Sequence, residues 1–343
     1  MGEFVGVDLH QRYCLIVRMD AQGQVLDRTR VATEATALHT YFDRLDPMAQ
    51  IVVEATGNWM YVADVLSDRQ LVLAHPWKTR AIAAARIKTD TLDATTLAHL
   101  LRTNLIPRAY LASPEIRERR ELVRCRARLS RDRVRLKTRL RALLAKHGLM
   151  VLARDILGRK ARRLLESVAL PPAAAAVLAS YLRVADALTA ELRTATTQIE
   201  AAVARDSQAQ VLVSLPGLGA FGALLLSATI GPIERFPTPK HLVSYLGLAP
   251  SVHSSGGHTR YGALTKQGDP DARWMLIEAA THAKRHQPFA PLYQRVKARQ
   301  GTPAARVAVA RRLVHLIHRI LTERRPFVPE AQWSGRPRGV MVQ

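Results

Sequence analysis

Apolar runs and polar breaks divide the first part of the chain into short elements. Residues 3–9, 13–19 and 24–31 are separated by polar or glycine-containing turns and are predicted to form three short strands. Further along, helical spacing alternates with short apolar runs. The pattern predicts helices at 35–45, 58–68 and 90–102, and strands at 50–53 and 71–74. Together these elements predict an α/β domain.

Two longer stretches carry a helical period throughout. Leucines recur every seven residues in 115–147, which predicts a helix with one apolar stripe. A second helix is predicted over 174–205, after the Pro171-Pro172 pair interrupts the chain. Two long helices joined by a turn indicate an antiparallel coiled-coil arm that can form a dimer contact. The repeating positions are Leu122, Leu129, Leu136 and Leu143, then Tyr181, Ala185, Leu188, Leu192, Ala195 and Ile199.

Residues 211–290 predict another compact unit, followed by a tail rich in Pro, Gly and Arg over 327–343. The unit opens on Leu-Pro-Gly-Leu-Gly at 215–219 and continues as an apolar helix to Ile230. A Pro-Gly-x-Gly turn before a helix is similar to the hairpin of helix-hairpin-helix modules, where backbone amides bind a phosphate. Because many helices begin after Pro-Gly, a purely structural turn is the competing interpretation.

The amino-acid composition indicates the class of binding partner. The chain has 343 residues, of which 48% are hydrophobic, enough for two or more domains with proper cores. Its net charge of +23 favours a polyanionic partner, and nucleic acid is the first choice. A membrane-surface role is less favoured, because no long apolar span or signal peptide is evident. With only two cysteines, no disulfide framework or cysteine zinc site is expected, which indicates a cytosolic protein.

The first long helix carries much of this charge. From Arg117 to Arg141 there are twelve Lys or Arg residues against three acids. One interpretation is a solvated helix that packs on its neighbour through the leucine stripe. The other is a helix that packs through leucine and binds phosphates through arginine, whose guanidinium suits bidentate phosphate contacts.

Four carboxylates near the start of the chain are candidates for catalysis. Asp8 ends the apolar run 4–8, and Glu54 follows the run 51–53. An acid at the end of a buried strand is costly unless it is paired or binds a metal. Asp90 and Asp93 stand three residues apart on one face of a predicted helix. Two such strand ends and an Asp pair are what a Mg²⁺ site for phosphodiester chemistry requires.

A second candidate cluster lies in residues 247–262, a Gly-rich loop with three serines, two histidines and an arginine. A serine beside Gly256-Gly257 can be approached closely by a phosphate. Arg260, Lys266 and Arg273 are candidates for stabilising charge that develops on it. By composition alone a flexible loop without chemistry is favoured, and His253 and His258 are more typical of plain loop residues than of bases or ligands.

Taken together, these residues resemble those of the bacterial insertion-sequence 110 family of transposases, also described as DEDD transposases or bridge-RNA-guided recombinases. The resemblance spans roughly residues 3–325, and its specificity lies in the order of several individually weak motifs. Three antiparallel strands followed by alternating helix and strand is also the order of a ribonuclease-H-type domain. The motifs are Val-Gly-Val-Asp8, Val-Val-Glu54-Ala-Thr-Gly, Lys-Thr-Asp90-Thr-Leu-Asp93-Ala, Leu-Pro-Gly-Leu-Gly, Tyr-Leu-Gly-Leu-Ala-Pro, Ser254-Ser255-Gly256-Gly257, and Thr-Lys-Gln-Gly-Asp before Arg273.

The resemblance implies a fold that is α/β plus α. A ribonuclease-H-like, resolvase-like DEDD domain would occupy 1–108, a basic helical coiled-coil linker arm 109–207, a helical transposase domain with a catalytic serine loop 208–326, and a tail 327–343. By matching position, Asp8, Glu54, Asp90 and Asp93 would bind Mg²⁺ or Mn²⁺. Ser255 would be the nucleophile, with the adjacent Ser254 as the alternative.

The resemblance also implies the function and the partners. The chain would be a cytoplasmic, nucleoid-associated recombinase that cuts and rejoins donor and target DNA, guided by a structured RNA, with no membrane partner. The acids of one subunit would work with the serine of another, in a homo-oligomer that is a dimer or, in the synaptic complex, a tetramer. A structure-selective, metal-dependent endonuclease that uses the acids alone is the alternative. A non-catalytic nucleic-acid scaffold is a third reading, disfavoured because all four acids are present.

Overall fold

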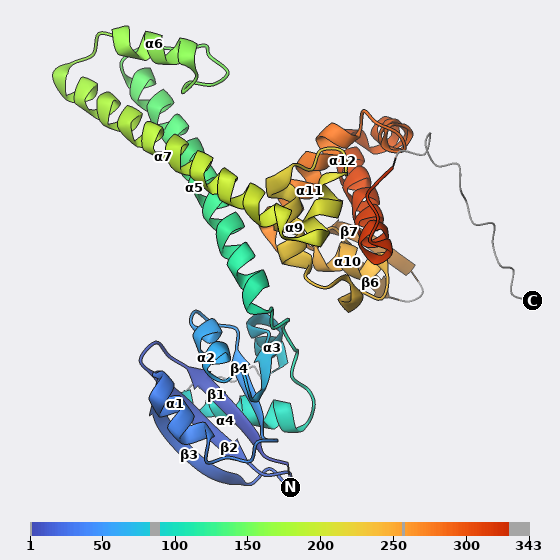
Figure 1. Ribbon diagram of the computed structural model, residues 1–343. Helices are drawn as coiled ribbons and strands as arrows, with labels where there is room; N and C mark the ends of the chain where they lie inside the picture. Colours follow the sequence, from blue (N-terminus) through green and yellow to red (C-terminus); the bar gives the residue numbers. More distant parts are fainter. Residues whose placement is uncertain (1, 83–89, 256–257, 329–343) are drawn as a thin grey trace, which may run out of the picture. The chain divides into compact units, whose positions relative to one another are not determined.

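The computed structural model describes residues 2–82, 90–255 and 258–328, and it divides into two compact units, Met1–Ala112 and Ser113–Gln343 (Figure 1). Side chains are described for these ranges except 90–92, 255, 258, 259 and 261. Asp90 and Ser255 are therefore placed here by their backbone alone. Each unit has its own hydrophobic core, so the two are described separately.

The first unit is built on a mixed five-stranded sheet in the order β3-β2-β1-β4-β5. The three leading strands pair in antiparallel fashion, and β4 and β5 run parallel to β1. All five predicted strands are confirmed to within one residue at either end. Their bounds are β1 Phe4–Leu9, β2 Tyr13–Met19, β3 Val25–Ala32, β4 Gln50–Glu54 and β5 Gln70–Ala74.

Three helices, α1, α2 and α4, cover the two faces of this sheet, and the short α3 follows β5. The predicted helices are present, and α3 is an additional short one that periodicity does not reveal. Helices α1 and α2 pack on the face that carries Val5, Val7 and Leu9, whereas α4 packs on the opposite face. The bounds are α1 Ala35–Phe42, α2 Trp59–Val65, α3 Pro76–Ile82 and α4 Asp90–Arg102.

Gly6 sets how closely α4 approaches the sheet. A Cβ at this position would stand 2.7 Å from the backbone nitrogen of Ala98 and closer still to the carbonyl oxygen of Ala94. Because real Cβ atoms do not approach backbone that closely, only glycine lets the helix lie directly on β1. The Val-Gly-Val-Asp motif therefore has two roles. Gly6 allows close packing of α4 on β1, and Asp8 supplies a carboxylate.

A carboxylate network fastens α1 to the edge of the sheet. The Tyr41 hydroxyl donates to Asp27 Oδ2 at 2.8 Å, and the Thr29 hydroxyl donates to the same carboxylate. Burial, which would raise the pKa of Asp27, is outweighed by these hydrogen bonds, so the pKa is lowered. A carboxyl with a lowered pKa stabilises the fold above its unfolded pKa, and that contribution is lost as the pH falls through the folded value.

We expect Tyr41→Phe to lower the free energy of unfolding by about 1 kcal/mol at pH 7, since one hydrogen bond to a partly exposed carboxylate is lost. The difference from the wild type should narrow below about pH 4, where Asp carboxyls become protonated. Urea unfolding at pH 7 and pH 3 measures both values. Tyr61→Phe, at an exposed tyrosine of α2, is the matched control. An equal loss at both pH values would contradict the role of Asp27.

Two long helices begin the second unit, α5 Pro114–Lys146 and α7 Pro172–Ala204, and they pack side by side as the predicted arm (Figure 1). The predicted turn between them is wrong. The connection holds α6, Arg159–Ser167, and has its own small core around Leu140, Ile156 and Leu165. In the part of the chain that is described, α7 alone is long and apolar enough to cross a membrane, and it lays its buried leucines toward α5.

The predicted leucine stripe of α5 is only partly right. Of its four leucines Leu136 is buried, and the others are half-buried. A straight helix turns by about 20° per heptad relative to an exact seven-residue repeat, so the buried positions shift along the face. The buried apolar residues of α5 are Val123, Ala127, Leu136, Leu140 and Leu144.

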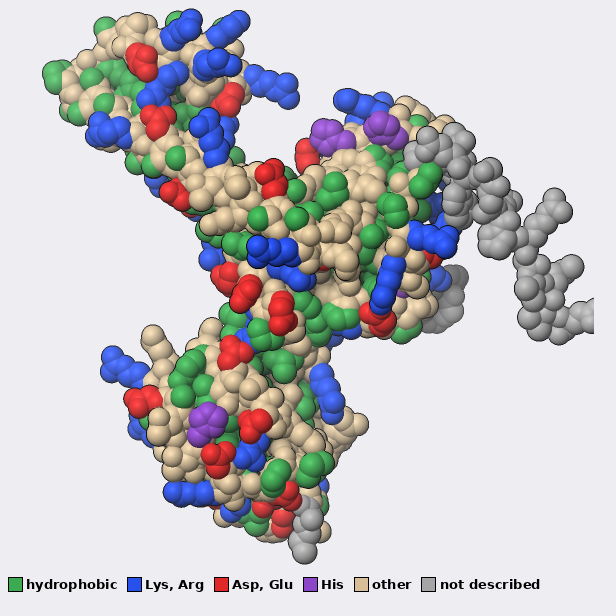
Figure 2. Space-filling view, in the orientation of Figure 1, with side chains coloured by type: hydrophobic (Ala, Val, Ile, Leu, Met, Phe, Trp, Pro, Cys, Tyr) green, Lys and Arg blue, Asp and Glu red, His purple; other side chains and the backbone are tan. Residues whose placement is uncertain are grey.

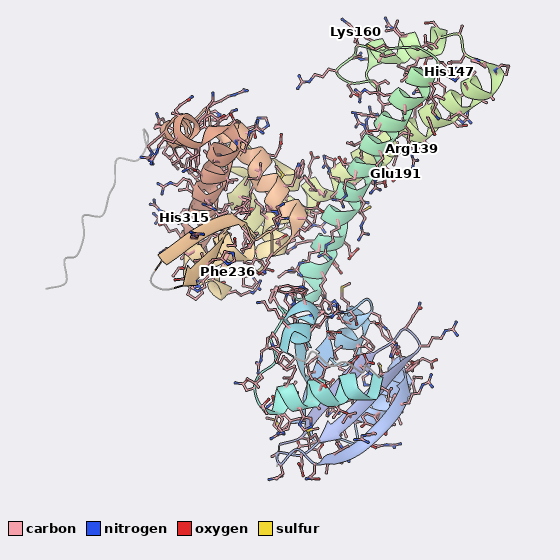
Figure 3. The ribbon with its side chains drawn as sticks, turned by 180° about the vertical axis from the view of Figure 1, so that it is seen from behind. Arg139, His147, Lys160, Glu191, Phe236 and His315 are labelled. Carbon is pink, nitrogen blue, oxygen red and sulfur yellow. The ribbon has the colours of Figure 1, made fainter. Side chains whose placement is uncertain are left out.

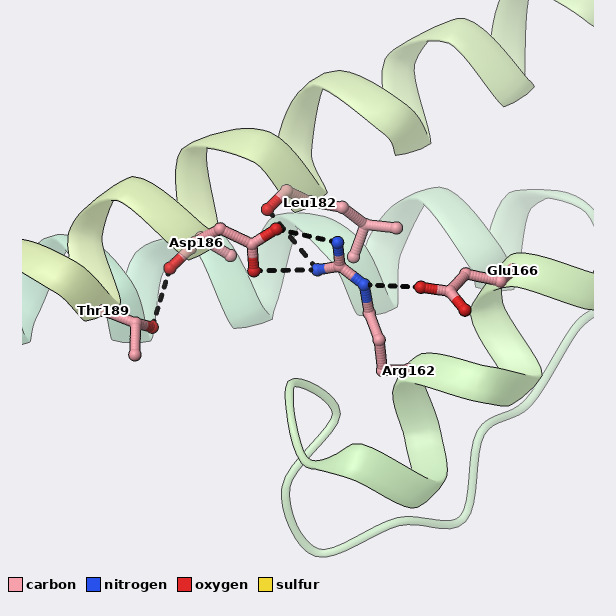
Figure 4. A network of polar contacts seen from close by, with 6 residues as sticks. Arg162, Glu166, Leu182, Asp186 and Thr189 are labelled. Carbon is pink, nitrogen blue, oxygen red and sulfur yellow. Dashed lines mark hydrogen bonds and ion pairs between the residues drawn. The ribbon is translucent and has the colours of Figure 1, made fainter.

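Hydrogen bonds and ion pairs join α6 to α7 (Figure 4). Arg162 donates in bidentate fashion to Asp186, from Nη1 at 3.1 Å and from Nη2 at 2.8 Å. Its Nε donates to Glu166 at 3.0 Å. The bidentate geometry fixes the rotation of α6 against α7.

The remaining helices form a compact core around α9, which is buried from Gly222 to Ile230. Gly301, with a φ of 81°, interrupts the long α12. A two-stranded hairpin, β6 and β7, adds strands to a unit that we predicted as helical. The bounds are α8 Ser207–Val213, α9 Ala220–Ile230, the 3-10 turn η1 Ile233–Arg235, α10 Pro239–Tyr245, β6 Pro250–Ser255, β7 His258–Leu264, α11 Pro270–Ala283 and α12 Phe289–Glu323.

Candidate active site

Asp8 and Glu54 stand on neighbouring parallel strands at the same end of the sheet. Val7 is in register with Val53, so the residue that follows each of them reaches the same edge. Side chains alternate between the faces of a strand, and Asp8 therefore shares a face with Gly6, the face that α4 covers. Glu54 lies on that face too, because Val52, two residues earlier, packs in the core beneath α4.

The first turn of α4 carries the other two acids. Asp93 is half-buried and directly precedes Ala94, the residue whose carbonyl oxygen faces Gly6. Asp90 is the first residue of the helix, and its side chain lies outside the described residues. Backbone geometry thus directs Asp8, Glu54 and the start of α4 to one face of the sheet. Among the described side chains, however, no three His, Cys, Asp or Glu residues are grouped closely enough to hold a metal ion.

His10 is a polar neighbour of Asp8 that the sequence analysis missed. Its Nε2 lies 3.1 Å from Asp8 Oδ2, and its ring stacks on Tyr13 with centroids 4.4 Å apart. The guanidinium of Arg30, on the neighbouring strand β3, lies 3.8 Å from the centroid of the Tyr13 ring. The signal was present in the sequence, because a residue two positions after Asp8 falls on the same side of the chain.

Cys14 lies on β2, opposite Leu9 of β1, and is not equipped to serve as a metal ligand. It is fully buried, and burial raises the pKa of its thiol. Its Sγ lies 3.4 Å from Thr33 Oγ1. A thiol that stays protonated in an apolar core acts as a small hydrophobic side chain.

The serine segment is a β-hairpin, which corrects the predicted Gly-rich loop. Ser254 is in register with Thr259, and Ser255 with His258, so both serines lie next to the tip. The tip itself, Gly256-Gly257, and the side chains of Ser255 and His258 lie outside the described residues. The loop prediction failed because Ser, His and Thr lack the apolar alternation that identifies strands, although their backbones pair in register from Val252 to Ser255.

Arginines brace the base of this hairpin. Arg311 of α12 donates from Nε to the carbonyl of Leu248 at 2.8 Å, and burial lowers its pKa. Arg273 of α11 donates from Nη1 to the carbonyl of Lys266 at 3.0 Å, so this proposed phosphate ligand also holds the turn after β7. Gly268, with a φ of 125°, lets that turn pass close to the carbonyl of Tyr245. The serines therefore extend from a fixed base.

The Leu-Pro-Gly-Leu-Gly turn has a clear structural role. Gly217 has a φ of 87°, and a Cβ there would stand 2.6 Å from the carbonyl oxygen of Ala279 in α11. Leu215 and Leu218 of the same turn are buried in the core of the unit. Packing accounts for Gly217, whereas nothing lies within 4 Å of a Cβ at Gly219, and phosphate binding by the turn stays a prediction.

Many arginines of α5 are engaged within their own unit. Arg119 pairs with the buried Asp206 at 3.0 Å, and Arg120 donates to the carbonyl of Ala228 at 2.8 Å. Lys137 pairs with Asp155 at 2.9 Å. Exposed basic residues are more frequent towards α6, as Figure 2 shows, and Figure 3 locates Arg139, His147 and Lys160 along this part. Along α5, the exposed basic residues therefore lie mostly in the half of the helix that leads to α6.

Family models match both units of the chain. A model described as a transposase of the IS116/IS110/IS902 family matches residues 209–294, the part that holds the hairpin and its supporting helices. The model of the DEDD transposases of IS110 elements, described as a transposase, matches residues 5–148. The second match contains the sheet except Phe4, together with the four acids and α5.

Curated relatives are similar over most of their length. A probable family 20 transposase of Pseudomonas aeruginosa is 28% identical over 290 residues, which cover 80% of this chain and 82% of the relative. The transposase for insertion sequence element IS1111A of Coxiella burnetii is 27% identical over 341 residues, which cover 95% and 91%. The transposase for insertion sequence element IS1328 of Yersinia enterocolitica is 23% identical over 281 residues, which cover 80% of this chain and 82% of the relative.

Proposed function

Because this chain is a transposase of the IS116/IS110/IS902 family, an enzyme that cuts and rejoins DNA, we propose that it does so through the acids of its first unit and a serine of its hairpin. One observation carries the proposal for the acids. Asp8 and Glu54 share one edge and one face of the sheet, and Gly6 brings the start of α4, with Asp90 and Asp93, onto that face. We propose that this unit is a ribonuclease-H-like DEDD domain.

Carboxylates suit the metal that such a site uses. Oxygen ligands from Asp and Glu are what Mg²⁺ and Mn²⁺ prefer, and four acids offer enough of them. When bound, the ion polarises the scissile phosphate and stabilises the leaving oxygen. Asp8, Glu54, Asp90 and Asp93 would hold it. His10 would fix the orientation of Asp8, because its ring is itself fixed by stacking on Tyr13.

Ser255 is the proposed nucleophile. Its Oγ would form a bond to phosphorus while the bond to the leaving sugar oxygen breaks, and the serine proton would be released as the sugar oxygen takes one up. One phosphoester replaces another, so the DNA can be rejoined later without ATP. Attack by water instead of serine would leave a free phosphate end on the DNA, with no phosphoester to the protein from which the strands could be rejoined. The arginine-braced base of the hairpin supports this role, because a nucleophile requires a defined position.

We propose that a structured guide RNA pairs with donor and target DNA, and that exposed basic residues of the arm bind the nucleic-acid backbones. The accompanying layout is a DEDD domain at 1–108, an arm at 109–207, a transposase domain at 208–326 and a tail at 327–343. The enzyme would act in the bacterial cytoplasm as a homo-oligomer. The charge of +23 supports the nucleic-acid partners.

The deciding experiment is the detection of a covalent protein–DNA adduct. Wild-type protein with its guide RNA, metal and labelled DNA should give an adduct that survives denaturation, with the phosphate mapped by mass spectrometry to Ser255. Ser255→Ala should abolish the adduct and strand transfer, whereas Ser254→Ala should retain both. The reverse pattern would move the nucleophile to Ser254. Unchanged cleavage by both variants would instead favour a metal-dependent endonuclease that uses the acids alone.

A further inference from the structure

A cavity in the second unit has no described hairpin residue in its lining and has no part in the proposed chemistry. It lies between α5, α9 and α11 and has a volume of about 480 Å³, within the range of about 300–1,000 Å³ that is typical of ligand pockets. We call it the Trp274 cavity. It is lined by Arg126, Ala127, Ser130, Arg131, Val134, Arg135, Phe221, Asp271 and Trp274.

Large apolar side chains are exposed around it. Trp274 is 56% exposed and Val134 is 59% exposed, although both stand in the interior of regular helices. The neighbours of Trp274 on α11, Met275 and Leu276, are buried in the core, so the helix itself is firmly packed. A tryptophan held exposed on a rigid helix offers a flat apolar surface ready for stacking.

Arg126 supplies an unbalanced positive charge at the same place. It is half-buried, and its guanidinium lies 4.3 Å from the centroid of the Phe221 ring. Its Nε donates to the neutral hydroxyl of Thr196 at 3.2 Å, and in the described part of the chain no carboxylate pairs with it. Burial lowers its pKa. A partly desolvated cation without an anion is costly, and a bound anion would offset that cost.

The other two arginines differ in how far they are neutralised. Arg131 pairs with Asp271 at 2.5 Å, with the arginine 49% exposed. Arg135 is 70% exposed and pairs with Asp132 at 2.9 Å. An ion pair between two exposed side chains adds little to stability, so it does little to neutralise Arg135. Arg126 and Arg135 are therefore the cations available to an incoming anion.

We propose that the Trp274 cavity binds one unpaired nucleotide of a single-stranded nucleic acid, with the base stacked on Trp274 and the adjoining phosphate held by Arg126 and Arg135. A free phosphate would leave the aromatic surface unused, and an apolar peptide would leave Arg126 without an anion. Bases within a duplex are stacked on each other, so their faces cannot reach Trp274. The inference rests on the proposed function only in that the enzyme handles nucleic acid.

The test is the affinity of the full chain for short oligonucleotides, measured by fluorescence anisotropy. We expect Trp274→Ala to weaken binding of a single-stranded oligothymidylate by about 10-fold, which is the usual size of one base–aromatic stack. Binding of a duplex of equal length should be unchanged. Trp77→Ala is the matched control, because Trp77 is 64% exposed on α3 of the other unit. A parallel series with oligouridylate tells whether DNA or RNA is the preferred strand.

Arg126→Gln provides an independent variant that keeps the tryptophan. It should weaken single-strand binding and reduce the slope of log affinity against log salt by about one. Circular dichroism melting checks that the variants are folded. The proposal is overturned if Trp274→Ala binds single strands like the wild type, if duplex binding falls equally, or if only the oligomeric state changes, which would make the cavity a protein interface. Ser255→Ala and Asp8→Asn should retain Trp274-dependent binding, so failure of the catalytic proposal stays distinguishable.

Discussion

Replacing Asp8 with Asn should lower the rate of DNA strand cleavage by about 1,000-fold. The amide keeps the shape of the side chain but removes the negative charge that a divalent cation requires. Losing several kcal/mol of charge stabilisation in the transition state corresponds to a change of this size. Cleavage of labelled DNA under single-turnover conditions, with the guide RNA present, measures it.

Two controls locate the cause of this loss. Asp68→Asn removes a carboxylate that is 66% exposed in the same unit and should leave cleavage unchanged. His10→Ala removes the partner that contacts Asp8 at 3.1 Å and should cost less than Asp8→Asn if the carboxylate itself holds the metal. Removal of divalent metal by EDTA should abolish wild-type cleavage, and added Mg²⁺ should restore it. Full cleavage by Asp8→Asn, or by chelated wild type, would exclude the acidic site.

Gly6→Ala is expected to have the second large effect, on the fold as well as on activity. The new methyl group would meet the backbone of α4 at Ala94 and Ala98, which can yield only if the whole helix moves. Overpacking of this kind costs about 1–3 kcal/mol, and we expect the upper end because backbone cannot rotate away as a side chain does. Thermal unfolding of the first unit should therefore shift downward by roughly 10 °C or more.

Gly57→Ala is the matched control in the same unit, because nothing lies within 4 Å of a Cβ at that position. It should leave the melting temperature within a few degrees of the wild type. Gly6→Ala should also reduce cleavage at temperatures where it remains folded, since α4 carries Asp90 and Asp93. A melting temperature and a cleavage rate equal to those of the wild type would show that α4 does not depend on close contact with β1.

The sheet of the first unit was predictable because its order follows from local patterns. Apolar runs such as 13–19 and 50–53 are short and bounded by turn residues, which identifies them as strands, and the acids Asp8 and Glu54 could be assigned to strand ends directly. By contrast, the hairpin was read as a loop because its residues are polar. The helix between the two long arm helices was missed for a related reason. Residues 159–167 carry mostly charged side chains, and their burial depends on contacts with other segments.

Local sequence determined the strands, the long helices, the four acids and the serines, because periodicity and residue chemistry act over a few neighbouring positions. Tertiary structure decided which of these features meet. Parallel pairing of β1 with β4 brought Asp8 and Glu54 to the same edge and face of the sheet, and the missing side chain of Gly6 let α4 pack closely on that face. Packing of three distant helices likewise placed Arg126 near Phe221 and Trp274. Such contacts join residues far apart in the chain, and only the folded backbone specifies their distances.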